Sequence, residues 1–253
     1  MIRFDNPLDP AKFDPKTVTV EPAVPGLSVQ AYGDTLQLSG AFVGRTTYTV
    51  TVPATVADTF GQTLGAAQNV VFRVGPAEKT LDASGDTMVV LDPAAGAKLP
   101  VWSTNHSALK VTIHAVEPET YGAWMKWLQA INYDDNRPKR LPGRFVHQGT
   151  VSPPSERDHK VETAIDLGPY CTEGTGQFVV LIEPTVQPKD RWDRQYVYRW
   201  VQVTKLGMTA FVDGDHAVGW VNELQSGDPL AGVKLSLLSG GSAVETGADG
   251  LAL

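Results

Sequence analysis

Two stretches near the C-terminal end decide the fold class: residues 200–207 read WVQVTKLG, and residues 226–233 read SGDPLAGV. The first belongs to a run over 196–203 that has large residues on both faces and predicts the closing strand of a β-domain. In the second, a Gly-Asp-Pro turn at 227–229 is followed by Leu230 and Val233, which resume the apolar pattern. We therefore predict a strand that leaves one β-domain, a very short joint, and the first hairpin of another domain. A chain built in this way is an array of β-domains.

The length of 253 residues fits two domains of ordinary size and part of a third. We expect a complete β-sandwich over residues 1–76, a second over 77–204, and the start of a third over 205–253. The last stretch ends before a domain of ordinary size is complete. On this interpretation the chain is a segment of a much longer protein.

The charge and the composition exclude several classes of partner. A net charge of −7 and a pI near 5.2 leave no basic surface for nucleic acid or for an anionic membrane. No apolar run reaches the roughly 18 residues that cross a bilayer, and the first residues lack an apolar signal core. Membrane attachment is thus expected only through an anchor outside this segment. The single cysteine, Cys171, permits no intrachain disulfide and leaves the redox compartment open.

The alternation of residue types predicts the strands of both complete domains. In 47–52 and 109–115, every second residue is apolar, which is typical of antiparallel strands with one buried face. Residues 178–182 are apolar on both faces and indicate a central strand. The fold class is therefore all-β, with tandem sandwiches of Ig-like size.

One segment of the second domain breaks the β pattern. Between Pro118 and Ile131, apolar residues recur at helical spacing, and Pro118 suits the first turn of a helix. We predict a short helical insertion near 118–131 with Trp124 in the core, followed by a long exposed loop over 132–155. Trp127 lies off the apolar stripe, and its environment is not predicted.

The stretch from 200 to 233 resembles the junction between macroglobulin-type domains in bacterial α2-macroglobulins, large cell-envelope proteins that trap proteases. In the first domain, residues 4–8 (FDNPL), 18–22 (VTVEP) and 58–64 (DTFGQTL) resemble bacterial Ig-like domains, in which an Asp-x-x-Gly turn precedes the last strand. The resemblance implies a non-enzymatic scaffold segment, without cofactors, of a broad-range protease inhibitor. It implies a periplasmic or cell-envelope location, including a lipoprotein form of the full-length chain.

The partners implied by this resemblance are proteases, bound through the full-length protein, and neighbouring macroglobulin-like domains of the same chain. Two other classes stay open. One is a structural or adhesive array of Ig-like domains at the cell surface, and the other is the accessory β-sandwich portion of a secreted hydrolase.

Cys171 is the most reactive residue type in the chain, and thioester-containing macroglobulins join a Cys to a Gln three residues later. Here Gly174 stands at that position and has no side chain to supply the acyl group, while Gln177 lies six residues away. We therefore predict a free thiol at Cys171 and no thioester.

Other chemical patterns have ordinary explanations. Ser107 and Lys110 match a Ser-x-x-Lys motif, but the Lys is predicted in a strand, where the two side chains do not converge. The five histidines show no metal-ligand spacing, and His114 shares the polar phase of its strand, which predicts a solvated side chain. Asp213-Gly214-Asp215 predicts a hairpin turn rather than a calcium site. We predict no catalytic, cofactor or metal site.

The remaining candidate is a basic stretch in an acidic chain, residues 137–144. Its prolines disfavour strand and helix, so we predict an exposed, protease-sensitive loop. The residues of this candidate site are Arg137, Lys139, Arg140 and Arg144. A solvated loop is the first interpretation, contact with a partner the second, and a bait for proteases the third, because the resemblance places the stretch upstream of the usual bait position.

Overall fold

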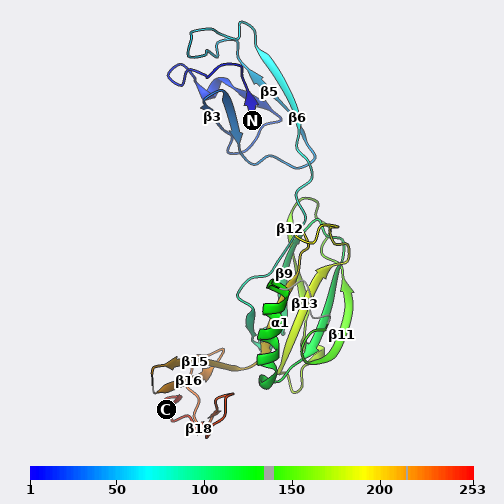
Figure 1. Cartoon of the computed structure of the whole chain (residues 1–253), viewed down its shortest axis with the longest axis vertical. Coiled ribbons are helices and arrows are strands. Elements are labelled where there is room, and N and C mark those ends of the chain that lie inside the picture. The colour runs from blue at the N-terminus through cyan, green and yellow to red at the C-terminus, as the bar shows by residue number, and fades with distance from the viewer. Residues whose placement is uncertain (134–139, 215) are drawn as a thin grey trace. The chain divides into compact units, whose positions relative to one another are not determined.

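The computed structural model describes residues 1–133, 140–214 and 216–253, and it divides into two compact units, Met1–Glu78 and Lys79–Leu253 (Figure 1). The division falls two residues after the predicted end of the first domain. A further division of the second unit at residue 204 stays a prediction. Each unit is described separately below.

The first unit is a β-sandwich of two three-stranded sheets, ordered β1-β4-β3 and β2-β5-β6. The core of this unit follows from the alternation along β5 (Thr47–Val52). Its apolar residues Tyr48, Val50 and Val52 are each 1% exposed or less and pack with Leu36 from the other sheet. The strands are β1 (Ile2–Arg3), β2 (Thr19–Glu21), β3 (Ser28–Tyr32), β4 (Thr35–Ser39), β5 (Thr47–Val52) and β6 (Gln68–Arg73). The strand predicted over 47–52 is confirmed.

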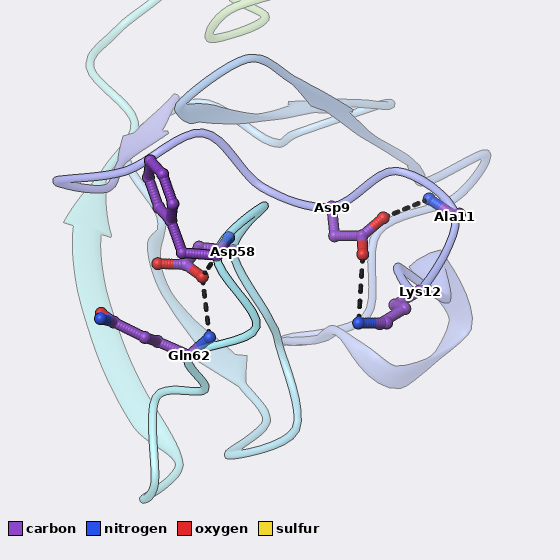
Figure 2. A network of polar contacts seen from close by, with 6 residues as sticks. Asp9, Ala11, Lys12, Asp58 and Gln62 are labelled. Atoms are coloured by element: carbon purple, nitrogen blue, oxygen red, sulfur yellow. Dashed lines mark hydrogen bonds and ion pairs between the residues drawn. The ribbon is translucent and has the colours of Figure 1, made fainter.

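The Asp-x-x-Gly turn forms where the sequence predicts it (Figure 2). The Asp58 carboxylate accepts hydrogen bonds from the backbone N–H groups of Phe60 and Gln62, at 2.9 and 2.8 Å. Its other oxygen accepts from the Asn6 side chain at 2.8 Å. Gly61 has a φ of 84°, a left-handed conformation that explains the glycine at this position.

The second unit contains a larger sandwich. Its five-stranded sheet, β11-β10-β13-β14-β8, is antiparallel except for the parallel β14–β8 pair, and the facing sheet has the order β12-β9-β7. Leu109, Phe178 and Val201 from the first sheet pack against Leu99 and Ile165 from the second. The strands are β7 (Thr80–Asp82), β8 (Met88–Leu91), β9 (Lys98–Thr104), β10 (Leu109–Ala115), β11 (Arg144–Val151), β12 (Lys160–Asp166), β13 (Gly176–Pro184) and β14 (Val197–Val203).

A helix covers the other face of the five-stranded sheet. The chain makes a 3-10 turn at Pro118–Thr120 and continues as α1 (Tyr121–Tyr133), which confirms the predicted helix. Trp124 is 1% exposed, as predicted, and packs with Leu128 against Trp200 of β14. Trp127 also faces the sheet at 8% exposure and stacks on Trp124, with ring centroids 5.4 Å apart.

The predicted long loop over 132–155 is wrong at residues 132–133 and 144–151, and residues 134–139 lie outside the described part of the chain. Helix α1 extends to Tyr133, and residues 144–151 form β11, the edge strand paired with β10. Only three apolar residues lie in this strand, Phe145, Val146 and Val151, so its side chains carry no clear alternation. It forms because β10 offers a free backbone edge, and a sequence pattern does not display that edge.

The C-terminal part of the second unit begins with the predicted hairpin after a two-residue joint. Strands β15 (Leu206–Val212) and β16 (Ala217–Glu223) pair antiparallel, and Asp213 and Gly214 lie in their connection. We predicted that the Gly-Asp-Pro turn at 227–229 closes this first hairpin, and this prediction is wrong. The turn follows β16, the second strand of the hairpin. The remaining strands are β17 (Lys234–Leu235), β18 (Val244–Glu245) and β19 (Leu251–Ala252). The all-β class with one short helical insertion is confirmed.

Candidate functional site

The structure describes two of the four basic residues of the candidate loop, Arg140 and Arg144. Arg137 and Lys139 lie outside the described residues. Arg140 is exposed and lies in a bend, whereas Arg144 is the first residue of β11, where its Cα pairs with that of Ala115. The prediction that Arg144 lies in a loop is wrong, because this exposed residue belongs to a strand. Proteases cut strands poorly unless the strand opens locally.

The three residues between Arg140 and β11 are anchored to the sheet. Leu141 is 7% exposed and packs in the cluster of Trp124 and Trp200. Gly143 has a φ of 87°, and a side chain there would collide with the Ala115 carbonyl and with the Val116 side chain at 2.5 Å. The segment is therefore anchored at Leu141 and by the close approach of Gly143 to the end of β10, although Gly143 itself is exposed, so the predicted solvated position is wrong for Leu141.

His114 of β10 lies beneath this segment. It is 4% exposed, which contradicts the predicted solvated position. Its Nδ1 is 3.3 Å from the carbonyl oxygen of Gly143, and its ring meets that of Phe145 edge to face at 5.7 Å. The polar phase of β10 points to the face on which α1 and residues 141–143 pack, and this explains why His114 is buried.

Burial also changes the acidity of this imidazole. Because desolvation disfavours the charged form, the pKa of His114 lies below its ordinary value. The backbone carbonyl groups of Gly143, Pro142 and Leu141 act in the opposite direction, and the positive charge of Arg140 lowers the pKa further. The signal that would have found this site is indirect: a helix with an apolar stripe must cover one face of a neighbouring strand.

Cys171 follows a 3-10 turn at Gly168–Tyr170, and its Sγ donates to the Leu167 carbonyl at 3.4 Å. Burial, followed by the charge of Asp166, raises the pKa of this thiol, so the reactive thiolate is disfavoured. The Gln177 side-chain oxygen accepts from Trp200 Nε1 at 3.1 Å and from Gln202 Nε2 at 3.4 Å. The free thiol stays a prediction that these contacts favour.

The other candidate positions serve structural roles. Lys110 Nζ forms an ion pair with Glu183 on the neighbouring strand at 2.7 Å, away from any partnership with Ser107. Asp213 accepts the backbone N–H of Gly214 at 2.7 Å within its hairpin. Across the described ranges, no three His, Cys, Asp or Glu side chains gather in a way that would hold a metal ion.

A hollow of about 520 Å³ lies at one side of the first unit, next to the Asp58 turn. Its walls include Phe4, Val56 and Leu64, and Asp58 lies at its border. Burial raises the pKa of Asp58, but the hydrogen bonds from Gln62, Asn6 and Phe60 outweigh this effect, so the pKa lies below its ordinary value. A carboxylate held ionised by three donors orders a turn and is a poor general acid.

Comparison with known proteins finds a family model for the first unit and similar solved structures for most of the chain. Residues 1–74 match the family model described as bacterial Ig-like domain. No curated protein matches the chain. None of the helices in the described parts is long and apolar enough to cross a membrane.

Two solved structures have a similar fold. The crystal structure of native α2-macroglobulin from Escherichia coli spanning domains MG0-NIE-MG1 matches 99% of this chain over 82% of its own length, with 16% identity and a TM-score of 0.53. The crystal structure of Salmonella α2-macroglobulin reacted with methylamine matches 97% of this chain with 14% identity and a TM-score of 0.63, and the match spans 15% of that protein. At such identity the likeness concerns the fold.

Proposed function

We propose that this chain is a scaffold segment of a bacterial α2-macroglobulin, a broad-range protease inhibitor that traps its targets in the periplasm or cell envelope. Its β-sandwich domains would connect and space the parts of a longer chain that meet the protease. In this role the segment itself has no catalytic residue, cofactor or metal. Its direct partners are neighbouring macroglobulin-like domains, and proteases are partners of the full-length protein only.

One observation carries the proposal: the likeness in fold extends over nearly the whole chain. The match covers 99% of this chain and 82% of the segment MG0-NIE-MG1 of the Escherichia coli protein. A single Ig-like domain is a common architecture that serves many functions. A succession of an Ig-like sandwich, a sandwich with one helix on its outer face, and a further hairpin is a more specific combination. The residues at the domain junction resemble the same family.

The test compares the isolated segment with a longer parent chain. Trapping requires a rearrangement of domains triggered by cleavage, so the 253-residue segment should not protect a large substrate from trypsin or elastase. The parent chain should do so, and a parent without these residues should trap less or unfold at a lower temperature. If a parent that lacks residues 1–253 traps equally well and is equally stable, the scaffold role is wrong. Stoichiometric protection by the segment alone would make residues 140–144 a candidate bait.

A structural or adhesive array at the cell surface is the second candidate, because the family model that matches residues 1–74 describes bacterial Ig-like domains in general. An adhesin segment should bind a cell-surface protein or glycan saturably by itself. A scaffold segment should show no such binding, and glycan-array and whole-cell binding assays with the isolated chain distinguish the two functions.

A further inference from the structure

The contact between His114 and the segment 140–144 has the features of a switch. A buried, ionisable side chain lies under a short segment that also places Leu141 in the tryptophan cluster and the backbone of Gly143 against β10. The same segment ends at two exposed arginines, Arg140 and Arg144. Its attachment to the sheet therefore controls access to two bonds that arginine-specific proteases recognise.

We propose that His114 is a pH-sensitive latch: when mild acid protonates its imidazole, residues 140–144 detach from the sheet and proteases reach the bonds after Arg140 and Arg144. This inference concerns regulation of the segment by pH and does not depend on the proposed function. It rests on the burial of the ring, on its hydrogen bond to Gly143, and on the close approach of Gly143 to β10.

The groups around the ring explain the direction of the switch. Arg140, on the segment itself, places a positive charge near His114. On β11, Phe145 is the residue opposite His114, whereas Arg144 and His147 pair with Ala115 and Ile113, in the other phase of β10. A second positive charge on the imidazole is therefore unfavourable in this place. Solvation of the charged ring is restored most readily if the covering segment moves, because β13 pairs with β10 without interruption, whereas the pairing of β11 shifts register next to His114 and leaves Arg144 and Phe145 beyond the shift.

The charges on the other elements do not reverse this expectation. On its own strand, the ammonium group of Lys110 is bound by Glu183 of β13 at 2.7 Å, so that carboxylate is already occupied. Helix α1 presents Trp124, Trp127 and Leu128 to the same cluster, whereas its Lys126 is exposed.

The sign of the pH dependence follows from linkage. The folded chain holds the neutral imidazole, and its pKa lies below that of the unfolded or detached form. His114 thus contributes to attachment at a pH above the ordinary imidazole value of about 6.5, and this contribution is lost as the pH falls below that value. The expected window begins near the ordinary imidazole value of about 6.5 and extends down to the lowered pKa of His114 in the folded chain.

The experiment measures the rate of cleavage after Arg140 and Arg144 in the whole 253-residue chain with an arginine-specific protease. Cleavage is followed by mass spectrometry at about pH 7.5 and about pH 5.5, on either side of the ordinary imidazole pKa. An unfolded synthetic peptide of residues 136–148 corrects for the pH dependence of the protease itself. In the unmodified chain the corrected rate should rise several-fold on acidification.

Two variants test whether His114 is the cause. His114→Phe fills a similar space without titrating, and His114→Gln keeps a donor for the Gly143 carbonyl, so both should show a corrected rate independent of pH. His159→Gln removes an exposed histidine in another loop and should behave as the unmodified chain does. If the rate does not rise in acid, or rises equally in both His114 variants, the latch is wrong.

A second measurement covers the case in which the His114 variants fold poorly. Hydrogen exchange of the peptides that contain residues 140–146, corrected for intrinsic rates, should become faster in acid in the unmodified chain. Exchange in β13, the neighbouring strand on the other side, should stay unchanged. Equal protection of 140–146 at both pH values would overturn the proposal without any substitution.

Discussion

The two units bury their sheets in different ways. In the first, each sheet has one buried face, and the alternate residues of β5, such as Thr49 and Thr51, remain partly exposed. In the second, β13 is buried on both faces, because the small sheet covers one and α1 covers the other. In the first unit, the polar residues that alternate with the apolar ones along β5 are therefore partly exposed. In the second unit, His114 alternates with apolar residues in the same way but is buried.

The aromatic residues follow the same division. In the first unit, Tyr48 packs with Phe42 and Phe72 between the two sheets. In the second, Trp124, Trp127 and Trp200 lie outside the sandwich, between helix and sheet. The second unit thus has an additional core that depends on one helix, and substitutions can remove that core while the sandwich remains.

Trp124→Ala should have the largest effect. The side chain is 1% exposed and packs on Trp127, so its loss should destabilise the second unit by about 3–5 kcal/mol. All six tryptophans lie in this unit, so tryptophan fluorescence in a denaturant titration measures its unfolding alone. Trp192→Ala, at a site 79% exposed, is the control and should change stability little. Loss of protection in hydrogen exchange within residues 1–78 would contradict the independence of the two cores.

Asp58→Asn should weaken the first unit only, and less than the loss of Trp124 weakens the second, because one turn depends on it. The pKa of Asp58 is lowered in the folded state, so its contribution is present above the ordinary value of 3.8 and is lost as the pH falls through the folded value. The Asn variant should therefore unfold at a lower temperature near neutral pH, and the difference from the unmodified chain should shrink in acid.

The control for this prediction is Asp9→Asn, a carboxylate in the same unit (Figure 2). Asp9 accepts the backbone N–H of Ala11 at 3.0 Å and pairs with Lys12 at 3.4 Å, and the Lys12 side chain is largely exposed. Exposed pairs of this kind contribute little, so the melting temperature should hardly change. A larger effect at Asp9 than at Asp58 would show that the polar turn is not the important element.

Arg199→Lys should have a moderate effect on the second unit. The guanidinium donates to the carbonyl oxygens of Tyr198, Ala83 and Gly85, at 2.9, 3.0 and 3.3 Å, and burial lowers its pKa. One ammonium group cannot span these positions, so we expect a loss of about 1–2 kcal/mol in fluorescence-monitored unfolding. Arg157→Lys, at an exposed position, is the matched control, and equal stability of the two variants would refute the bridging role.

Ser103→Ala should have the smallest effect. Ser103 lies on the inner face of β9 at 0% exposure, and its hydroxyl has no hydrogen-bond partner among the described residues. Removing an unsatisfied buried hydroxyl should leave stability within about 0.5 kcal/mol or raise it slightly. A loss comparable to that of Arg199→Lys would indicate a bound water or another partner at this hydroxyl.

The sequence by itself determined the elements whose apolar residues recur at a regular spacing or whose turn residues are diagnostic. The strand over 47–52, the strand over 109–115, the helix after Pro118 and the Asp58 turn all follow from local periodicity and turn chemistry. These features repeat within a few residues and need no knowledge of the rest of the chain. The exposed loop predicted for the basic stretch was confirmed at Arg140, which lies in an exposed bend.

Only the tertiary structure decided which faces are covered. Periodicity shows which phase of a strand is apolar, but it does not show what packs over the other phase. The solvated position predicted for His114 was therefore wrong, and no position was predicted for Trp127. Strand β11 was not predicted, because backbone pairing to the edge of β10 holds it in place and its side chains lack a regular pattern. Contacts between segments distant in the sequence decide both features, since a residue's neighbours in space are set by the packing of whole elements.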